Sequence, residues 1–177
     1  MHPARHRALR ELGAFARQMK DHWAKLGARL DLPALLDGAE AAAAILEEVR
    51  ELASARDLEI GPAALSAGRV ARARPPVPDA ALERNQALRF ALLDAEHLLV
   101  LCQYVGALSA ADGDGQLAEA CQRWKESLQR PARAARRAAV ALGKDPDAAI
   151  EPLSVAHRIG WAIGWLGEAT DRRAKRG

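Results

Sequence analysis

An aspartate and a histidine near the middle of the chain, Asp94 and His97, stand three positions apart. Residues at this spacing project from the same side of an α-helix, so the pair could ligate a metal ion or carry out acid–base chemistry. The structural alternative is that the two side chains hydrogen-bond to each other or to nearby backbone groups, as buried polar side chains usually do. A divalent metal is therefore a possible cofactor, but the sequence does not strongly imply one.

His157 and Glu168 could add to this pair, because their spacing places them on one face of a predicted helix near the C-terminus. The four residues could form a metal or small-ligand site if the two helices are neighbours. The favoured interpretation of the second helix is packing, because its closely spaced glycines allow helices to approach. The two Glu-x-x-His motifs of ferritin-like di-metal bundles are missing.

Four arginines recur at spacings of 7, 3 and 4 in the C-terminal third of the chain: Arg123, Arg130, Arg133 and Arg137. Guanidinium groups bind phosphate oxygens, so this stripe could contact a nucleic acid or another polyanion. Few aromatic residues accompany the arginines, and Trp124 is expected to face the core. A solvated basic face is the simpler interpretation.

The two cysteines, Cys102 and Cys121, lie at similar distances from a Gly/Asp-rich turn at residues 111–115. They are expected at similar heights on adjacent antiparallel helices. Helix axes 8–10 Å apart usually separate α-carbons too widely for a disulfide. We therefore expect two buried thiols, with a redox pair as the alternative.

The elements that must position these residues are helices. The chain has 177 residues with 41 alanines, and only 13 are valine, isoleucine or threonine, too few to supply a sheet of ordinary size. One all-α domain over residues 1–177 is predicted, a single antiparallel bundle of four long helices plus one short or broken helix in a long connection. A ferritin-like topology is an analogy of arrangement only.

The clearest periodicity predicts a first helix over residues 4–30, with one apolar stripe: Leu9, Leu12, Ala16, Met19, Trp23, Leu26 and Leu30. A capping box at Asp37 and Glu40 predicts the start of a second helix. That helix is expected to bury Ala39, Ala42, Leu46, Val49 and Ala53.

Prolines and glycines make residues 58–78 a crossover connection, which could contain a short helix. Asp79 is expected to cap a third helix that runs to residue 110, with Phe90, Leu93, Leu101, Tyr104 and Leu108 on an apolar face beside His97. A fourth helix should end near Gly143, and Asp145-Pro146 should begin a fifth. Pro131 and Pro152 must kink these last two helices or split them.

Charge is unevenly distributed along the chain. The net charge is +3, and the basic excess lies in the C-terminal third, including a basic tail at residues 172–177. The N-terminal residues are charged and lack the apolar stretch of a secretory signal, so a cytoplasmic location is predicted. Charged residues interrupt the most apolar segment, residues 87–108, which is therefore interpreted as a buried helix and not a membrane span.

No complete catalytic constellation is present, so we do not predict an enzyme. The predicted function is a cytoplasmic interaction or assembly module that binds a protein partner or forms a homo-oligomer, through an Ala/Gly-rich or Trp-bearing face. Two alternatives remain open. One is a metal- or small-ligand-binding bundle, and the other is a nucleic-acid-binding accessory subunit that uses the arginine stripe.

Overall fold

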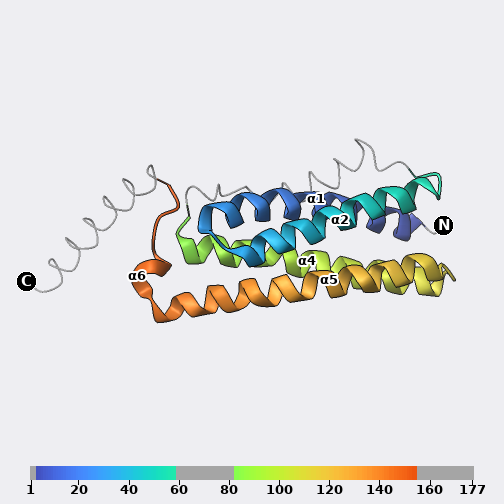
Figure 1. Ribbon diagram of the computed structural model, residues 1–177. Helices are drawn as coiled ribbons and strands as arrows, with labels where there is room; N and C mark the ends of the chain where they lie inside the picture. The colour runs from blue at the N-terminus through green and yellow to red at the C-terminus, as the bar shows by residue number, and fades with distance from the viewer. Residues whose placement is uncertain (1–2, 59–81, 155–177) are drawn as a thin grey trace, which may run out of the picture.

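The protein is an all-α helical bundle. The computed structural model describes residues 3–58 and 82–154 (Figure 1). The long helices are α1 (Pro3–Leu30), α2 (Pro33–Ser54), α4 (Arg84–Ala111) and α5 (Gly115–Ala141). A short 3-10 helix, η2 (Leu142–Lys144), and a single helical turn, α6 (Pro146–Ala149), follow α5.

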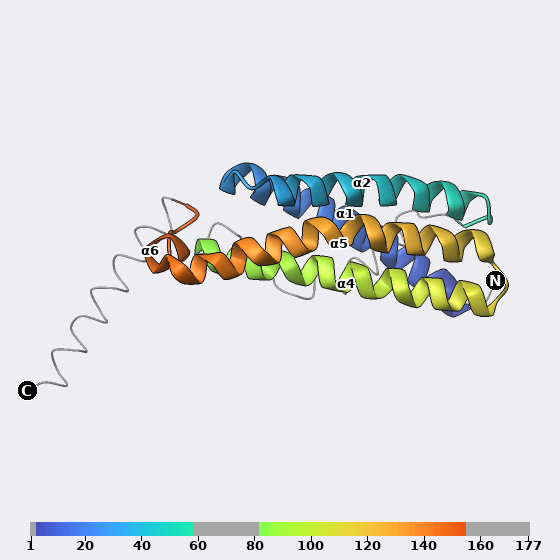
Figure 2. The ribbon, with the colours of Figure 1, turned by 60° about the horizontal axis from the view of Figure 1, so that its bottom comes forward.

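The four long helices form two antiparallel hairpins, α1 with α2 and α4 with α5. The hairpins pack through two further contacts, α1 against α4 and α2 against α5. Figures 1 and 2 show that α2 ends at one end of the bundle and α4 begins at the other. Residues 59–81 therefore join opposite ends, as expected of a crossover, although the short helix predicted there lies outside the described residues.

The apolar stripe predicted for the first helix is confirmed. All seven of its residues are buried in α1, and Leu12, Ala16, Met19 and Trp23 have no exposed surface. The five residues predicted to face inward from the second helix are also buried. Trp23 of the first stripe packs against Gly38 of α2. The contact is so close that a Cβ at position 38 would collide with the indole ring.

The start predicted for the second helix is wrong. Helix α2 begins at Pro33 without a side-chain cap, so Asp37 and Glu40 lie inside the helix instead of forming a capping box. Proline suits a first helical position because a backbone N–H at that position would have no acceptor within the helix. The chain reverses between α1 and α2 at Asp31, whose φ of 50° is one that aspartate tolerates.

The face predicted for the third helix is only partly right. Leu101 is buried and Leu108 packs against the core, but Phe90, Leu93 and Tyr104 are 43–50% exposed. The side chain of His97 is 39% exposed. The buried face of α4 combines small residues with leucines and a valine: Ala87, Leu88, Ala91, Asp94, Ala95, Leu98, Leu101, Cys102, Val105 and Ser109.

The ends of the later helices follow local rules. Helix α4 begins at Arg84, later than predicted, with a reciprocal capping box between Glu83 and Gln86; Asp79 lies outside the described residues. The Asp114 side chain caps α5 by accepting a hydrogen bond from the backbone N–H of Leu117. Pro131 lies within α5, which continues through it as one helix.

The predicted fifth helix begins at Asp145-Pro146 but stops after one turn, at Ala149. The chain then pairs with the start of α4. Its backbone forms a bridge between Glu83 and Pro152, and the N–H of Arg84 donates to the carbonyl of Glu151 at 2.9 Å. Pro152 lies in this bridge, beyond the end of α6, and residues 155–177, where the predicted helix would continue, lie outside the described part of the chain.

Among the described helices, α4 alone is long and apolar enough to cross a membrane, as judged by length and composition. The core helix of a folded bundle passes the same test, so this is weak support for a span. Asp94 is buried within the apolar window and bonded to α1, as in a core helix.

Candidate functional site

Asp94 makes its contacts with α1 and not with His97. Its carboxylate lies 2.5 Å from Nδ1 of His22 and accepts a hydrogen bond of 3.1 Å from the Gln18 amide. The Asp94 side chain is 9% exposed and that of His22 is 22% exposed. This is a carboxylate–imidazole pair at the contact between two helices, shielded from most solvent.

His97 has different neighbours. Its Nε2 lies 3.5 Å from a carboxylate oxygen of Glu11, and its ring packs against Phe15 with the ring centroids 4.0 Å apart. Asp94 and His97 therefore serve separate contacts. They do not satisfy one another, which was the structural alternative, and they do not share one site.

The four-residue metal or small-ligand site finds no further support. No group of three or more His, Cys, Asp and Glu residues that could hold a metal ion occurs in residues 3–58 and 82–154. His157 and Glu168 lie outside the described residues, so their part of the prediction stays a prediction.

The α1/α4 contact contains a third polar link. The indole N–H of Trp23, whose side chain is fully buried, donates to the carbonyl of Ala91 at 2.9 Å. The apolar periodicity predicted Trp23 on the buried stripe, but neither this bond nor the bonds of His22 and Gln18 to Asp94. Gln18 and His22 directly precede two residues of that stripe, Met19 and Trp23, which was the available signal.

The outer side of this contact is apolar. We define the α4 stripe as five residues at spacings of 3, 4, 3 and 4: Phe90, Leu93, His97, Val100 and Tyr104. Apart from His97, each of them is a large hydrophobic residue exposed at 43–60%. Phe15 packs beneath His97, so both phenylalanines and the single tyrosine of the chain gather on this side. Exposed apolar patches with polar edges mark interaction sites.

The opposite pair of helices, α2 and α5, shows the reverse arrangement. Trp124 is buried on α5, as predicted, and its indole N–H donates to Glu48 at 2.5 Å. Arg123 forms an ion pair with the same Glu48 carboxylate. Because Trp23 and Trp124 are both buried, they do not provide the Trp-bearing association face that was predicted; Trp161 and Trp165 lie outside the described residues.

The remaining arginines of the predicted stripe, Arg130, Arg133 and Arg137, are exposed on α5. They form no ion pair with the described residues, in contrast to Arg123. This part of the stripe is a solvated basic face, as the simpler interpretation expected, and its guanidinium groups are open to an anion.

Cys102 and Cys121 are free and buried, on α4 and α5 respectively. Burial raises the pKa of both thiols to about 12. They border a shallow groove of about 310 Å³ between the two helices, close to Gly106. The thiolate is the reactive form, so this environment favours two buried thiols over the redox pair.

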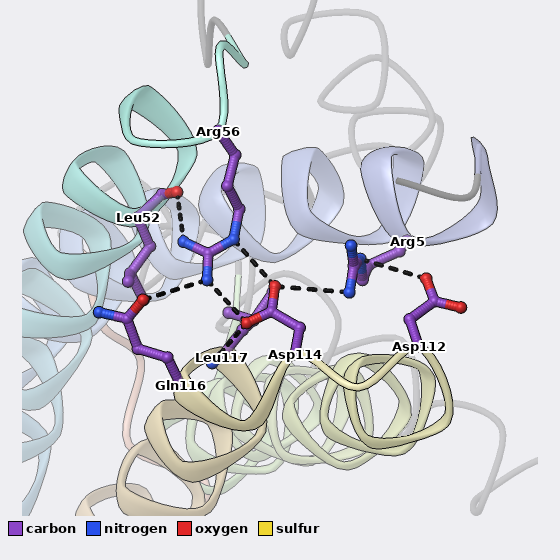
Figure 3. Close-up of polar contacts among 7 residues, drawn as sticks. All are labelled: Arg5, Leu52, Arg56, Asp112, Asp114, Gln116 and Leu117. Atoms are coloured by element: carbon purple, nitrogen blue, oxygen red, sulfur yellow. Dashed lines mark hydrogen bonds and ion pairs between the residues drawn. The ribbon is translucent and has the colours of Figure 1, made fainter.

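A cluster of charged residues closes one end of the bundle (Figure 3). The guanidinium of Arg56, at the end of α2, donates to both carboxylate oxygens of Asp114 at 2.8 and 2.9 Å. Arg5 of α1 lies 3.4 Å from Asp114 and 3.5 Å from Asp112. The hydrogen bond from Arg56 lowers the pKa of Asp114, and the pKa of Arg56 is raised in return. This cluster ties three segments together.

No protein-family model, curated protein or solved structure matches the chain. Its function must therefore be argued from the chain itself.

Proposed function

We propose that this protein is a helical-bundle interaction module that binds a protein surface through the α4 stripe. The observation that supports the proposal is the exposure of four large apolar side chains along one helix. Leu93 and Val100 lie at its centre and are 43% and 60% exposed. The core does not need these side chains, since the buried face of α4 is complete without them.

The position of the stripe favours binding over chemistry. Two of the charged groups beside it are already engaged, Glu11 with His97 and Glu96 with Arg136. Engaged groups hold a surface in one shape and leave its apolar centre free to contact a partner. This proposal replaces the Ala/Gly-rich or Trp-bearing face with a Phe/Tyr-bearing one.

The test compares the full chain with a double variant, Leu93→Glu with Val100→Glu, using size-exclusion chromatography with light scattering and co-purification. The native chain should have a mass above that of the monomer or retain a protein partner, and the double variant should lose both. The matched control is Val140→Glu, which adds a charge at a 73% exposed valine on α5. A native chain that is monomeric and retains no partner would contradict the proposal.

A second function, binding of a polyanion, is supported by the exposed arginines of α5. Arg130, Arg133 and Arg137 lie on one solvent face without an acidic partner among the described residues. Phosphates along a nucleic acid could occupy all three, with Arg123 beside them still bonded to Glu48.

Salt dependence tests this second function. Each phosphate neutralised on duplex DNA contributes about −0.9 to the slope of log K against log salt concentration, so three arginines predict a slope near −3. Replacing Arg130, Arg133 and Arg137 with alanine should abolish that dependence, whereas Arg89→Ala on α4 should leave it nearly intact. If the triple variant keeps the same slope of log K against log salt concentration, binding of a polyanion through these arginines is refuted.

A further inference from the structure

The α4 stripe is nearly symmetric about its central residue. Counting outward from His97, an aliphatic side chain comes first on each side, at Leu93 and Val100. An aromatic side chain follows on each side, seven positions from His97, at Phe90 and Tyr104. A stripe with this order reads alike in both directions.

We propose that the α4 stripe binds the same stripe of a second copy of this chain, with the two α4 helices antiparallel and a two-fold axis at His97. The proposal rests on the proposed function, because it names the partner of the same surface. An interface with a two-fold axis must be self-complementary. If one residue contacts a second residue of the other copy, that second residue in the first copy contacts the first residue in the other. Antiparallel pairing brings Phe90 opposite Tyr104 of the second copy, and Leu93 beside its Val100.

The charges at the edge of the stripe favour this direction. Arg89 and Gln103 are both exposed on the same edge of α4. Antiparallel pairing places Arg89 near Gln103 of the second copy, whose amide oxygen can accept a hydrogen bond. Parallel pairing about a two-fold axis would instead place Arg89 of one copy and Gln103 of the other on opposite edges of the contact, where they could not bond.

The remaining edge charges do not oppose the contact. Glu96 is bound by Arg136 of its own chain, and Glu11 lies against His97. Glu96 therefore meets its counterpart with a guanidinium group beside it. The ring of His97 rests on Phe15, which leaves its outer side directed toward the axis.

The size of the stripe sets the strength of the dimer. Phe90 and Tyr104 are about half exposed, which leaves roughly 100 Å² of each aromatic side chain to bury. With Leu93 and Val100 the stripe offers a few hundred Å² per copy, below the roughly 800 Å² per partner of a standard stable interface. The dimer should therefore dissociate on dilution.

Disulfide cross-linking of the full chain tests the geometry. The variants His97→Cys, Phe90→Cys and Tyr104→Cys each place one exposed thiol on the stripe, and Val140→Cys on α5 serves as the control. The native thiols can stay, because burial raises the pKa of Cys102 and Cys121 to about 12. Circular dichroism confirms that each variant is folded before oxidation.

The antiparallel dimer predicts a specific pattern. His97→Cys should form a covalent dimer alone, Phe90→Cys and Tyr104→Cys should form one only when mixed, and Val140→Cys should form none. Self-linking of Phe90→Cys and of Tyr104→Cys would show a parallel pair and overturn the proposal.

Two other results also overturn it and separate it from the proposed function. In the first result, the native chain binds a different protein through the stripe, and the His97→Cys variant forms no cross-link. The interaction module would then stand, and the dimer would be refuted. A native chain that stays monomeric, binds no protein and sediments with phospholipid vesicles would remove both.

Discussion

The two contacts that join the hairpins are built in opposite ways. Between α1 and α4 the buried side carries a polar pair, Asp94 with His22, and the outer side carries the apolar α4 stripe. Between α2 and α5 the buried side is apolar, and the charged groups of Glu48 and Arg123 lie toward solvent.

The difference separates what holds the fold from what remains available for binding. The α2/α5 contact follows the usual rule that apolar groups leave water and charged groups stay in it. The α1/α4 contact buries the polar pair of Asp94 and His22 and leaves large apolar groups in water. We propose that a partner covers this exposed apolar surface.

The largest expected effect breaks the polar pair. Asp94→Ala leaves His22 and Gln18 without their buried acceptor, and we expect it to lower the free energy of unfolding by about 2–3 kcal/mol. Glu48→Ala on the α2/α5 contact should cost less, about 1 kcal/mol, because Arg123 stays exposed to water and only the buried indole N–H of Trp124 loses its partner. Urea unfolding measures both, and equal losses would erase the contrast between the two contacts.

The next effect acts on Trp23, which bridges α1 and α4 through its bond to Ala91. Gly38→Ala places a methyl group inside the Trp23 ring, so the indole must shift, and we expect a loss of about 1–3 kcal/mol. Gly106→Ala is the matched control, since its Cβ would meet the Cβ of Cys121 at 3.2 Å. There the gain in helix propensity, about 1 kcal/mol, should offset most of the crowding. Thermal unfolding that ranks Gly106→Ala as the more damaging change would contradict this packing.

A smaller effect should appear at acid pH and affect both contacts together. The pKa of Asp114 is lowered by the hydrogen bond from Arg56, so the folded protein releases this proton more readily than the unfolded chain. Its contribution to stability is therefore present above the unfolded value, about 3.9, and is lost as pH falls through the lower folded value.

The variant Asp114→Asn should cost about 1.5 kcal/mol at neutral pH, the low end of the range for a hydrogen bond to a charged group. It should also flatten the acid limb of the stability curve. Denaturant unfolding at a series of pH values measures this, and an acid limb as steep as that of the native chain would show that other carboxylates are responsible.

Much of the fold could be predicted from the sequence where one helix face is distinctly apolar. The α1 stripe met that condition, and all of its residues are buried. Helix α4 did not, because large apolar residues lie on both of its faces. The large residues Phe90, Leu93 and Tyr104 were predicted to be buried, but α4 turns the face with Ala87, Ala91 and Ala95 toward the core.

The candidate site was less predictable. Asp94 and His97 were singled out as a candidate pair, but their partners lie on α1, more than 70 positions earlier in the chain. No local spacing encodes such a contact. Two helix starts were also missed, because the proline at Pro33 and the capping box of Glu83 with Gln86 outweighed the spacing at Asp37 and Asp79.

The smallest effect on stability sharpens the comparison most. Val100→Ser on the α4 stripe and Arg133→Ser on α5 should each change the unfolding free energy by about 1 kcal/mol or less, because Val100 is 60% exposed and Arg133 is exposed. Only Val100→Ser should weaken self-association. Thermal unfolding combined with light scattering checks both, and a loss above about 2 kcal/mol for Val100→Ser would mean that the stripe supports the fold.

Sedimentation equilibrium of the full chain over a wide range of concentration tests the central claim most directly. The native protein should rise from the monomer mass of 19.0 kDa toward twice that mass as concentration increases, and Leu93→Glu should stay at the monomer mass. An association that is unaffected by Leu93→Glu but lost in Arg133→Ser would contradict the account, because the binding surface would then lie on α5.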